Sequence, residues 1–213
     1  MRAMNCRSTL LLALAALALA GCPDRVVPVE VRIVNPRASG VGPDPFQGVT
    51  HLRFRVLGAD GAVVEYEGER LERVAERDAG STSFESLPSG RPLRLQVAGF
   101  NGHPQHGGSE LVSVGLSARF TVPEEKTSET PPVKVSVFLR AVERFSPVVL
   151  AADPTRRATL SEPRAGHTAT LLADGRVLIA GGFEGAGRDP LSWRYKDSVE
   201  IFDPATGEVT PTS

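Results

Sequence analysis

Apolar and polar residues alternate one by one over long stretches of this chain, and this pattern constrains its fold more than any other feature. The longest run has an apolar side chain at every second position from Val112 to Val122, and another extends from Val133 to Ala141. Shorter runs cover 29–33, 52–56 and 93–97. Period two places successive side chains on opposite faces of a strand. We therefore expect antiparallel sheets in which the apolar positions face the core.

Turn signals separate these runs. The 213 residues include 21 Gly and 17 Pro, which fits many short turns and excludes a helical bundle. Asp60-Gly61 predicts a hairpin of type I′, a turn that needs positive φ at both central residues. Residues 69–77 fit either a helical turn or an irregular strand, and 123–132 predict a long polar loop. The patterns together predict an all-β protein with a sandwich over residues 26–142.

One segment resembles a known kind of sandwich. Phe84-Glu85-Ser86-Leu87-Pro88-Ser89-Gly90, followed by the run at 93–97 and Asn101, is similar to the E–F corner of fibronectin type III and related Ig-like domains. In those domains a leucine precedes a turn with proline or glycine that redirects the chain to the opposite sheet. The resemblance implies an antiparallel Ig-like β-sandwich and carries no information about function.

The N-terminus has the pattern of an export signal. Leu10 to Ala20 form an apolar run of eleven residues, preceded by Arg2 and Arg7. Such a run is too short to cross a bilayer as a helix, which needs about 20 residues. We therefore interpret residues 1–21 as a signal peptide that is removed.

The end of this run resembles the lipobox of bacterial lipoproteins. Leu19-Ala20-Gly21-Cys22 places small residues directly before a cysteine. The resemblance implies that Cys22 is lipidated and begins the mature chain, with residues 22–25 as the lipidated N-terminus. Two or more acyl chains anchor a protein stably to a membrane. Because Pro23 differs from the Asp that marks inner-membrane retention, we expect the outer membrane of a Gram-negative bacterium. The alternative is an ordinary secretory signal that leaves a free thiol.

Charge and cysteine content narrow the function classes. Without Arg2 and Arg7, 22 basic side chains remain against 25 acidic ones, a net charge of −3. Such a balance, with no basic block, argues against nucleic-acid binding. Cys6 leaves with the signal peptide, so the exported chain has no intrachain disulfide.

The C-terminal part resembles a second family. After a linker at 143–157, the stretches Pro163–Leu172, Arg176–Gly182 and Ser198–Gly207 are similar to the kelch repeat, the four-stranded blade of a β-propeller. The resemblance implies a single kelch-type blade over residues 158–213. The residues that carry it, all with structural roles, are Arg164, Gly166, His167, Gly181, Gly182, Phe202, Asp203, Pro204 and Gly207.

The residues of this signature have physical roles in the expected blade. Asp174-Gly175 predicts the first hairpin, and Val177–Ile179 predicts a strand that neighbouring blades bury on both faces. Gly181-Gly182 fits a crowded strand end, and Gly207 fits a turn that needs positive φ. We expect His167 to be a structural hydrogen-bonding residue. The sequence departs from the family where Val209 replaces a tryptophan and Trp193 lies in a loop.

A single blade cannot bury both faces by itself, since propellers have about 4–8 blades. Three solutions stay open. The blade docks on the sandwich, it assembles with a second chain, or the sequence is a truncated fragment of a longer multi-blade protein.

The sequence has few candidates for chemistry. His103 and His106 lie in a glycine-flanked loop, where they could offer half of a zinc site with His51 and Glu110. We expect a solvated loop instead, with no metal and no cofactor. The common nucleophile, phosphate-loop and zinc-protease motifs are absent from the sequence.

The resulting hypothesis is a non-catalytic, membrane-anchored surface lipoprotein that binds a protein or glycan ligand or acts in adhesion. Self-assembly through the lone blade is included in it. The alternative class is an enzyme, because bacterial kelch propellers resemble the central domain of galactose oxidase. That chemistry needs copper and a tyrosine–cysteine cofactor, whereas this chain has two tyrosines and no exported cysteine besides Cys22.

Overall fold

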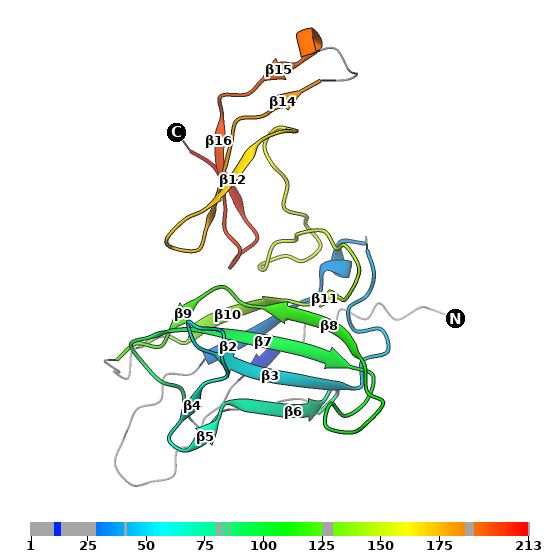
Figure 1. Ribbon diagram of the computed structural model, residues 1–213, viewed down its shortest axis with the longest axis vertical. Helices are drawn as coiled ribbons and strands as arrows, with labels where there is room; N and C mark the ends of the chain where they lie inside the picture. Colours follow the sequence, from blue (N-terminus) through cyan, green and yellow to red (C-terminus); the bar gives the residue numbers. More distant parts are fainter. Residues whose placement is uncertain are drawn as a thin grey trace.

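The computed structural model describes residues 11–13, 29–40, 42–79, 82, 84, 86–124, 130–185 and 190–212. This part of the chain consists of strands, turns and two short 3₁₀ helices, η1 (Pro36–Ser39) and η2 (Pro190–Ser192). The prediction of an all-β protein is therefore confirmed. A layered N-terminal unit and a separate C-terminal sheet are joined by an irregular segment (Figure 1). Among the described residues, no helix has the length and apolar character needed to span a bilayer.

Two sheets form the N-terminal unit. One has the order β1-β2-β10, with strands β1 (Leu11–Ala13), β2 (Val29–Val34) and β10 (Val133–Phe138). The other has the order β11-β8-β7-β3-β6, with strands β11 (Arg140–Ala141), β8 (Leu111–Leu116), β7 (Pro92–Phe100), β3 (His51–Leu57) and β6 (Glu72–Glu76). The short strand β9 (Phe120–Thr121) also pairs with β7. Strand β1 lies within the predicted signal peptide, and the remainder of that segment lies outside the described residues.

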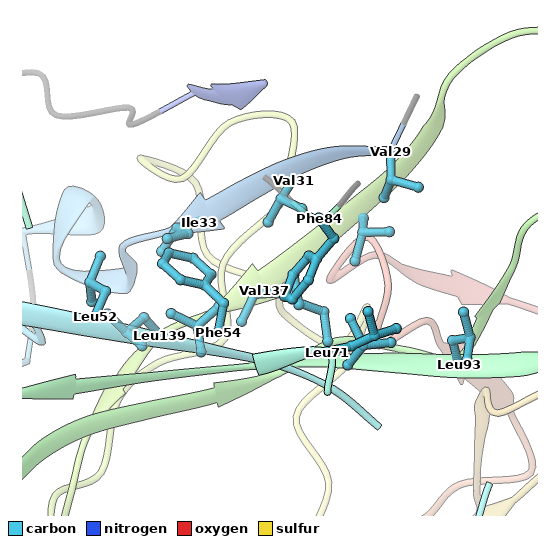
Figure 2. Packing of buried hydrophobic residues seen from close by; sticks show 14 of the residues in the cluster. Val29, Val31, Ile33, Leu52, Phe54, Leu71, Phe84, Leu93, Val137 and Leu139 are labelled. Carbon is cyan, nitrogen blue, oxygen red and sulfur yellow. The ribbon is translucent and has the colours of Figure 1, made fainter. Parts of the chain in front are cut away.

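The core lies between the two sheets and follows the alternation of the sequence. Strand β2 contributes Val29, Val31 and Ile33 to this core, and Ile33 lies beside Leu52 and Phe54 of β3 (Figure 2). Each of the five is at most 4 % exposed. Burying a side chain of this size contributes about 1.5–3 kcal/mol relative to leaving it in water. The expected core faces of the runs at 29–33, 52–56 and 93–97 are therefore confirmed.

Strand β8 departs from its expected face. Val114 and Leu116 are 36 % and 42 % exposed, whereas Ser113 is fully buried. The register between β7 and β8 shifts between Leu111 and Ser113, which leaves Val112 as an extra residue opposite Gly99 and Phe100. A shift of one residue moves every following side chain to the opposite face. The prediction that the whole run 112–122 faces inward is therefore wrong for its central positions.

Close approach of the other sheet explains why small residues point inward here. A Cβ added to Gly115 would lie 2.7 Å from the carbonyl oxygen of Phe138 and 2.7 Å from Val137 Cγ1. The chain crosses from one sheet to the other at Leu139, because β10 pairs with β2 whereas β11 pairs with β8. The crossing segment lies too close to β8 to leave room for Val or Leu.

The pairing of β10 with β2 is parallel, which corrects the expectation of purely antiparallel sheets. Val133 pairs with Val29, and the register continues to Phe138 and Val34. The first long strand of the unit and its last therefore lie side by side and run in the same direction (Figure 1).

The turns refine two further predictions. Residues 69–77 form the strands β5 (Glu69–Arg70) and β6, so the helical alternative is wrong. Asp60-Gly61 does make a hairpin turn, but only Gly61 has positive φ, at 80°. The turn therefore has three loop residues with a left-handed Gly, not type I′. Positive φ at two successive residues occurs instead at Glu67-Gly68, between β4 (Glu65–Tyr66) and β5. Residues 125–129 of the predicted loop at 123–132 lie outside the described part.

The C-terminal sheet has four strands in sequential antiparallel order. They are β12 (Thr168–Leu171), β13 (Val177–Ala180), β16 (Val199–Phe202) and β17 (Val209–Pro211). A second hairpin, made of β14 (Phe183–Glu184) and β15 (Arg194–Tyr195), extends from the end of the sheet where β13 ends and β16 begins (Figure 1). At the Asp174-Gly175 hairpin, again only Gly175 has positive φ.

Candidate functional site

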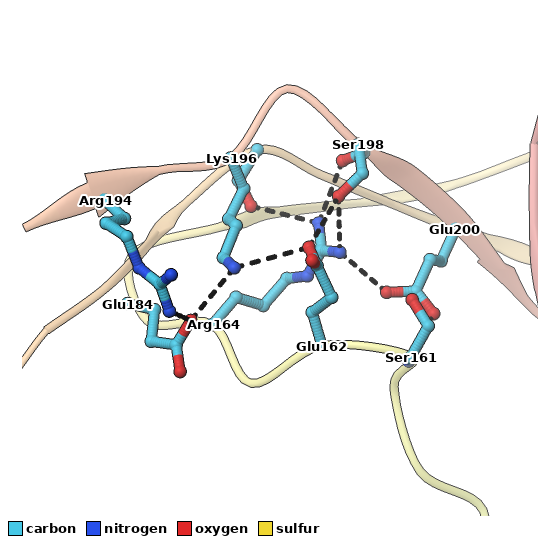
Figure 3. Close-up of polar contacts among 9 residues, drawn as sticks. Ser161, Glu162, Arg164, Glu184, Arg194, Lys196, Ser198 and Glu200 are labelled. Carbon is cyan, nitrogen blue, oxygen red and sulfur yellow. Dashed lines mark hydrogen bonds and ion pairs between the residues drawn. The ribbon is translucent and has the colours of Figure 1, made fainter.

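A buried ion pair holds in place the segment that leads into the C-terminal sheet. The guanidinium of Arg164 donates to Glu200 Oε1 at 2.7 Å, to the backbone oxygen of Ser198 at 2.8 Å and to that of Gly181 at 3.2 Å (Figure 3). The other carboxylate oxygen of Glu200 accepts from the backbone N–H of Ser161 at 2.8 Å. The Arg164 and Glu200 side chains are 0 % and 1 % exposed. This pair joins the segment before β12 to the ends of β13 and β16.

Sequence patterns predicted Arg164 but missed Glu200. The sequence did contain a signal for Glu200, because this residue lies between Val199 and Ile201 in an otherwise apolar strand. A buried carboxylate in such a place needs a cation as a partner.

Four exposed or half-buried charges continue this network outward. Lys196 Nζ lies 3.0 Å from Glu184 Oε2 and 3.4 Å from Glu162 Oε2, and Arg194 donates to the same Glu184 oxygen at 2.8 Å (Figure 3). The hydrogen bond from Lys196 lowers the pKa of the Glu184 carboxyl, and the same bond raises the pKa of the Lys196 ammonium. These contacts tie the β14–β15 hairpin to the segment at 161–165.

Positive φ, and for Gly166 and Gly182 also crowding, favours glycine at these positions of the kelch-like signature. Gly181 and Gly182 both have positive φ, and a Cβ on Gly182 would lie 2.6 Å from the backbone oxygen of Ala165. Gly166 also has positive φ, and its Cβ would lie 2.8 Å from the ring of Phe183. The expectation of a crowded strand end is therefore confirmed for Gly182 but not for Gly181, whose Cβ would lie 3.6 Å from its nearest neighbour, the Lys196 backbone oxygen.

The turn after β16 has the expected form. Asp203 Oδ1 accepts from the backbone N–H of Ala205 at 2.7 Å, and the Asp203 backbone oxygen accepts from Gly207 at 2.8 Å. Gly207 has φ of 78°, as predicted. Pro204 lies in this turn, and Phe202 is half-buried at the end of β16.

Two aromatic positions differ from expectation. His167 is exposed, and its ring makes no hydrogen bond within the described part of the chain, so the structural role expected of it is not found. Trp193 stacks on Phe183 with ring centroids 4.1 Å apart and planes 7° apart. The β14–β15 hairpin is thus closed by an aromatic pair that the sequence patterns did not predict.

Neither face of the C-terminal sheet is fully covered. The strand register places on one face Leu171, Val177, Ile179, Phe202 and Val209 beside the buried Glu200, and on the other Leu178, Ala180, Val199 and Ile201. Leu171 is 73 % exposed, and the apolar residues of β13 are half-buried. Within this chain Val177–Ile179 are therefore only partly covered, and the expectation that neighbouring blades bury them on both faces stays a prediction.

The linker, in contrast, is packed. Val149 is fully buried and Ala151 is 7 % exposed, and both cluster with Val34 of β2 and with Phe138. The backbone N–H of Ala151 donates to the Thr206 oxygen at 2.7 Å, in the turn between β16 and β17. The segment therefore links the edge of the sandwich to one end of the C-terminal sheet but does not cover the faces of that sheet.

Three histidines come together at one end of the sandwich. His51 begins β3, and His103 and His106 lie in the loop between β7 and β8. The ring centroids of His51 and His103 are 5.2 Å apart, and those of His103 and His106 are 4.5 Å apart. Glu110 is occupied elsewhere, because its carboxylate and backbone both bond Asn101.

The predicted lipidation site, Cys22, lies outside the described residues. A comparison of the chain with protein-family models, with curated proteins and with solved structures finds no match in any of the three.

Proposed function

We propose that this protein is a non-catalytic, membrane-anchored surface lipoprotein whose C-terminal sheet is a kelch-type blade that binds another β-sheet protein. The observation that carries the proposal is the incomplete cover of the apolar sheet faces, where Leu171 is 73 % exposed and the apolar residues of β13 are half-buried. Isolated exposed apolar residues are ordinary, but a contiguous apolar face marks an interaction surface. Aliphatic side chains favour a protein partner over a glycan, whose hydroxyl groups would lose hydrogen bonds there.

Several features support the finer assignments within this proposal. The sequential order of the four strands and the crowded position of Gly182 are what the kelch resemblance implies. The two-layer N-terminal unit agrees with an Ig-like sandwich, in which the resemblance at 84–101 would form the turn into β7. The Leu19-Ala20-Gly21-Cys22 pattern supports the lipid anchor and, with Pro23, the outer membrane.

The anchor is tested by the substitution Cys22→Ala. We expect the variant to lose lipidation and to move from the membrane fraction to the soluble fraction, since the acyl chains supply the membrane affinity. Metabolic labelling with a palmitate analogue and detergent-phase partitioning measure both effects. A variant that still partitions into the detergent phase like the parent protein contradicts the anchor.

The binding surface is tested by the substitution Leu171→Glu. A charge placed on the exposed side of β12 should prevent a second apolar sheet from packing there, while the fold is unaffected because the position is exposed. Phe145→Glu is the matched control, since Phe145 is fully exposed in the linker, away from the sheet faces. We expect a pull-down from solubilised envelopes to recover a partner with the parent protein and with the control, but not with Leu171→Glu. Equal recovery by all three proteins, or by none, contradicts the proposal.

The same incompletely covered faces favour an alternative source for the partner sheet. Further blades of a longer kelch propeller would pack on them as the neighbouring blades do in a complete propeller. The DNA downstream of the codon for Ser213 tests this alternative directly, since it would encode further Gly-His-Thr-Ala and Gly-Gly repeats.

A further inference from the structure

We propose that strand β2 of the mature protein pairs edge to edge with β2 of a second copy, so that two chains share one continuous sheet. The inference rests on the proposed function, under which residues 1–21 are removed. Strand β1 lies in that segment, and it pairs with β2 on the side away from β10. Its removal makes β2 the edge of its sheet. An uncovered edge presents a row of backbone N–H and C=O groups to another strand.

The structure shows how a strand pairs with this edge. Residues Leu11–Ala13 run antiparallel to β2, with Leu12 opposite Val31. The backbone around Val31 therefore accepts an extended chain. Two copies of one strand that are related by a twofold axis are also antiparallel, and the same residues then lie on both sides of the interface. A second β2 therefore fits the position that β1 leaves.

The sequence of β2 selects one register for this pairing. Val29, Val31 and Ile33 are buried in the core, and the charged residues Glu30 and Arg32 alternate with them. Directly opposite residues of an antiparallel pair point to the same face, so the apolar side chains stay inside only if the axis passes through a residue. An axis at Glu30 places two carboxylates opposite each other, and an axis at Arg32 places two guanidinium groups opposite each other. An axis at Val31 places Glu30 of each copy opposite Arg32 of the other.

The two charged residues can make these contacts. Glu30 is exposed and forms no ion pair with other described residues. Arg32 Nε is buried without a hydrogen-bond partner in the described part of the chain, and one terminal nitrogen makes a long contact of 3.4 Å to the Ala152 oxygen. Hydrogen bonds from Thr155 are the main cause of the lowered pKa of Asp153, to which the Arg32 charge adds a smaller effect. A carboxylate opposite Arg32 would supply a partner for Nε.

The interface is small, so the membrane anchor contributes to it. A strand of six residues is short beside the roughly 1,000 Å² that a stable interface buries. Exposed ion pairs add little to such a contact. Anchoring both chains in one membrane raises their effective concentration, which strengthens a weak contact without any new interaction. We therefore expect paired chains in the membrane and monomers in dilute detergent solution.

Disulfide trapping in intact membranes tests the pairing and its register. We expect chains with Glu30→Cys, co-expressed with chains with Arg32→Cys, to form a disulfide-linked dimer, because opposite residues have Cβ atoms about 4.5–5.5 Å apart. The matched control combines Lys134→Cys with Ser136→Cys. These two positions lie beside Glu30 and Arg32 on β10, with the same spacing but one strand further from the edge. Across the pair they would be about 14 Å apart, so this control should stay monomeric.

Charge exchange tests the same contact without added cysteines. In a pair of identical chains, Glu30→Arg and Arg32→Glu each place like charges opposite each other. Energy transfer between two labelled populations of the lipidated protein in phospholipid vesicles should therefore fall, for each variant alone, to the level of chains that mix at random. Vesicles that hold both variants should regain the transfer, because every Arg then lies opposite a Glu. A misfolded variant would not recover in this way.

Mass spectrometry of the purified protein separates two kinds of failure. If residues 1–21 are still present, β1 keeps its place on β2, and both the proposed anchor and this inference are overturned. If they are removed and the pair Glu30→Cys and Arg32→Cys gives no more dimer than the control pair, this inference alone is overturned. Energy transfer that stays at the parent level in both charge variants overturns it as well.

Discussion

At the scale of single residues, the pair of Arg164 and Glu200 shows how one contact organises the C-terminal sheet. Both side chains are buried, and together they bond the segment before β12, the end of β13 and the strand β16. A buried ion pair contributes little compared with an apolar pair, but removing one partner leaves an uncompensated charge. Replacing either residue alone should therefore destabilise the sheet by more than the intact pair stabilises it.

We expect Arg164→Met to destabilise the C-terminal sheet by about 3–5 kcal/mol, because Glu200 is then buried without a cation. Urea unfolding followed by fluorescence measures this effect in the sheet itself, since Trp193 is the one tryptophan of the chain and lies in the β14–β15 hairpin region. The double variant Arg164→Met/Glu200→Leu should recover much of the lost stability, because no unpaired charge is then buried. Arg176→Met is the control, because its ion pair with Asp174 is exposed. Equal stability of Arg164→Met and Arg176→Met would contradict this prediction.

At the scale of elements, strand β8 shows what alternation can and cannot predict. The period of two is correct and the strand exists, but the bulge at Val112 reverses which side chains face inward. Alternation alone gives no sign of such a bulge, because it depends on how closely the crossing segment at Leu139 approaches β8. Ser113 and Gly115 were the available signal, since small residues at every second position indicate a close neighbour.

The inward face of β8 gives a test at this scale. Gly115→Ala should destabilise the sandwich by about 1–3 kcal/mol, because the added Cβ would lie 2.7 Å from the Phe138 oxygen and from Val137. Gly107→Ala is the matched control, since nothing lies within 4 Å of its Cβ position and its φ is not positive. Thermal unfolding followed by far-ultraviolet circular dichroism compares the two. Equal midpoints for both variants would mean that the sheets separate easily at this point.

Residues of the candidate sites were predictable where they belong to a local sequence signature and not where strand pairing brings them together. Arg164 and the glycines follow from a local signature, so the sequence alone identified them. Glu200 is distant from Arg164 along the chain, and its role depends on strand pairing. The convergence of His51 with His103 depends on the pairing of β3 with β7, where His51 is the partner of Phe100. Residues brought together by sheet register are difficult to pair from one sequence, since each possible register gives a different set of neighbours.

At the scale of the whole molecule, the linker determines how the two parts are coupled. Val149 and Ala151 pack on the sandwich edge, and the same segment bonds the turn at Thr206. The C-terminal sheet therefore gains support at one end while its faces stay incompletely covered. This arrangement agrees with the proposed role as a binding module, because the linker holds the sheet at one end and leaves apolar residues such as Leu171 exposed.

Gly207 lies at this junction and provides the test of the coupling. A Cβ at Gly207 would collide with the backbone oxygen of Val149, and its φ of 78° adds backbone strain. Gly175 separates these effects, since its φ is 90° but nothing lies within 4 Å of its Cβ position. Both Gly207→Ala and Gly175→Ala carry the strain, and only the first disturbs the linker.

We expect amide hydrogen exchange in β16 and β17 to be faster in Gly207→Ala than in Gly175→Ala, because the C-terminal sheet loses its contact with the buried linker. Exchange in β3 and β7 should be the same in both variants, since the sandwich core does not depend on the junction. If β16 and β17 exchange equally fast in the two variants, the linker contact adds no stability to the sheet. Slower exchange at higher protein concentration in Gly207→Ala would show instead that a second copy supports the incompletely covered faces, because only association follows mass action.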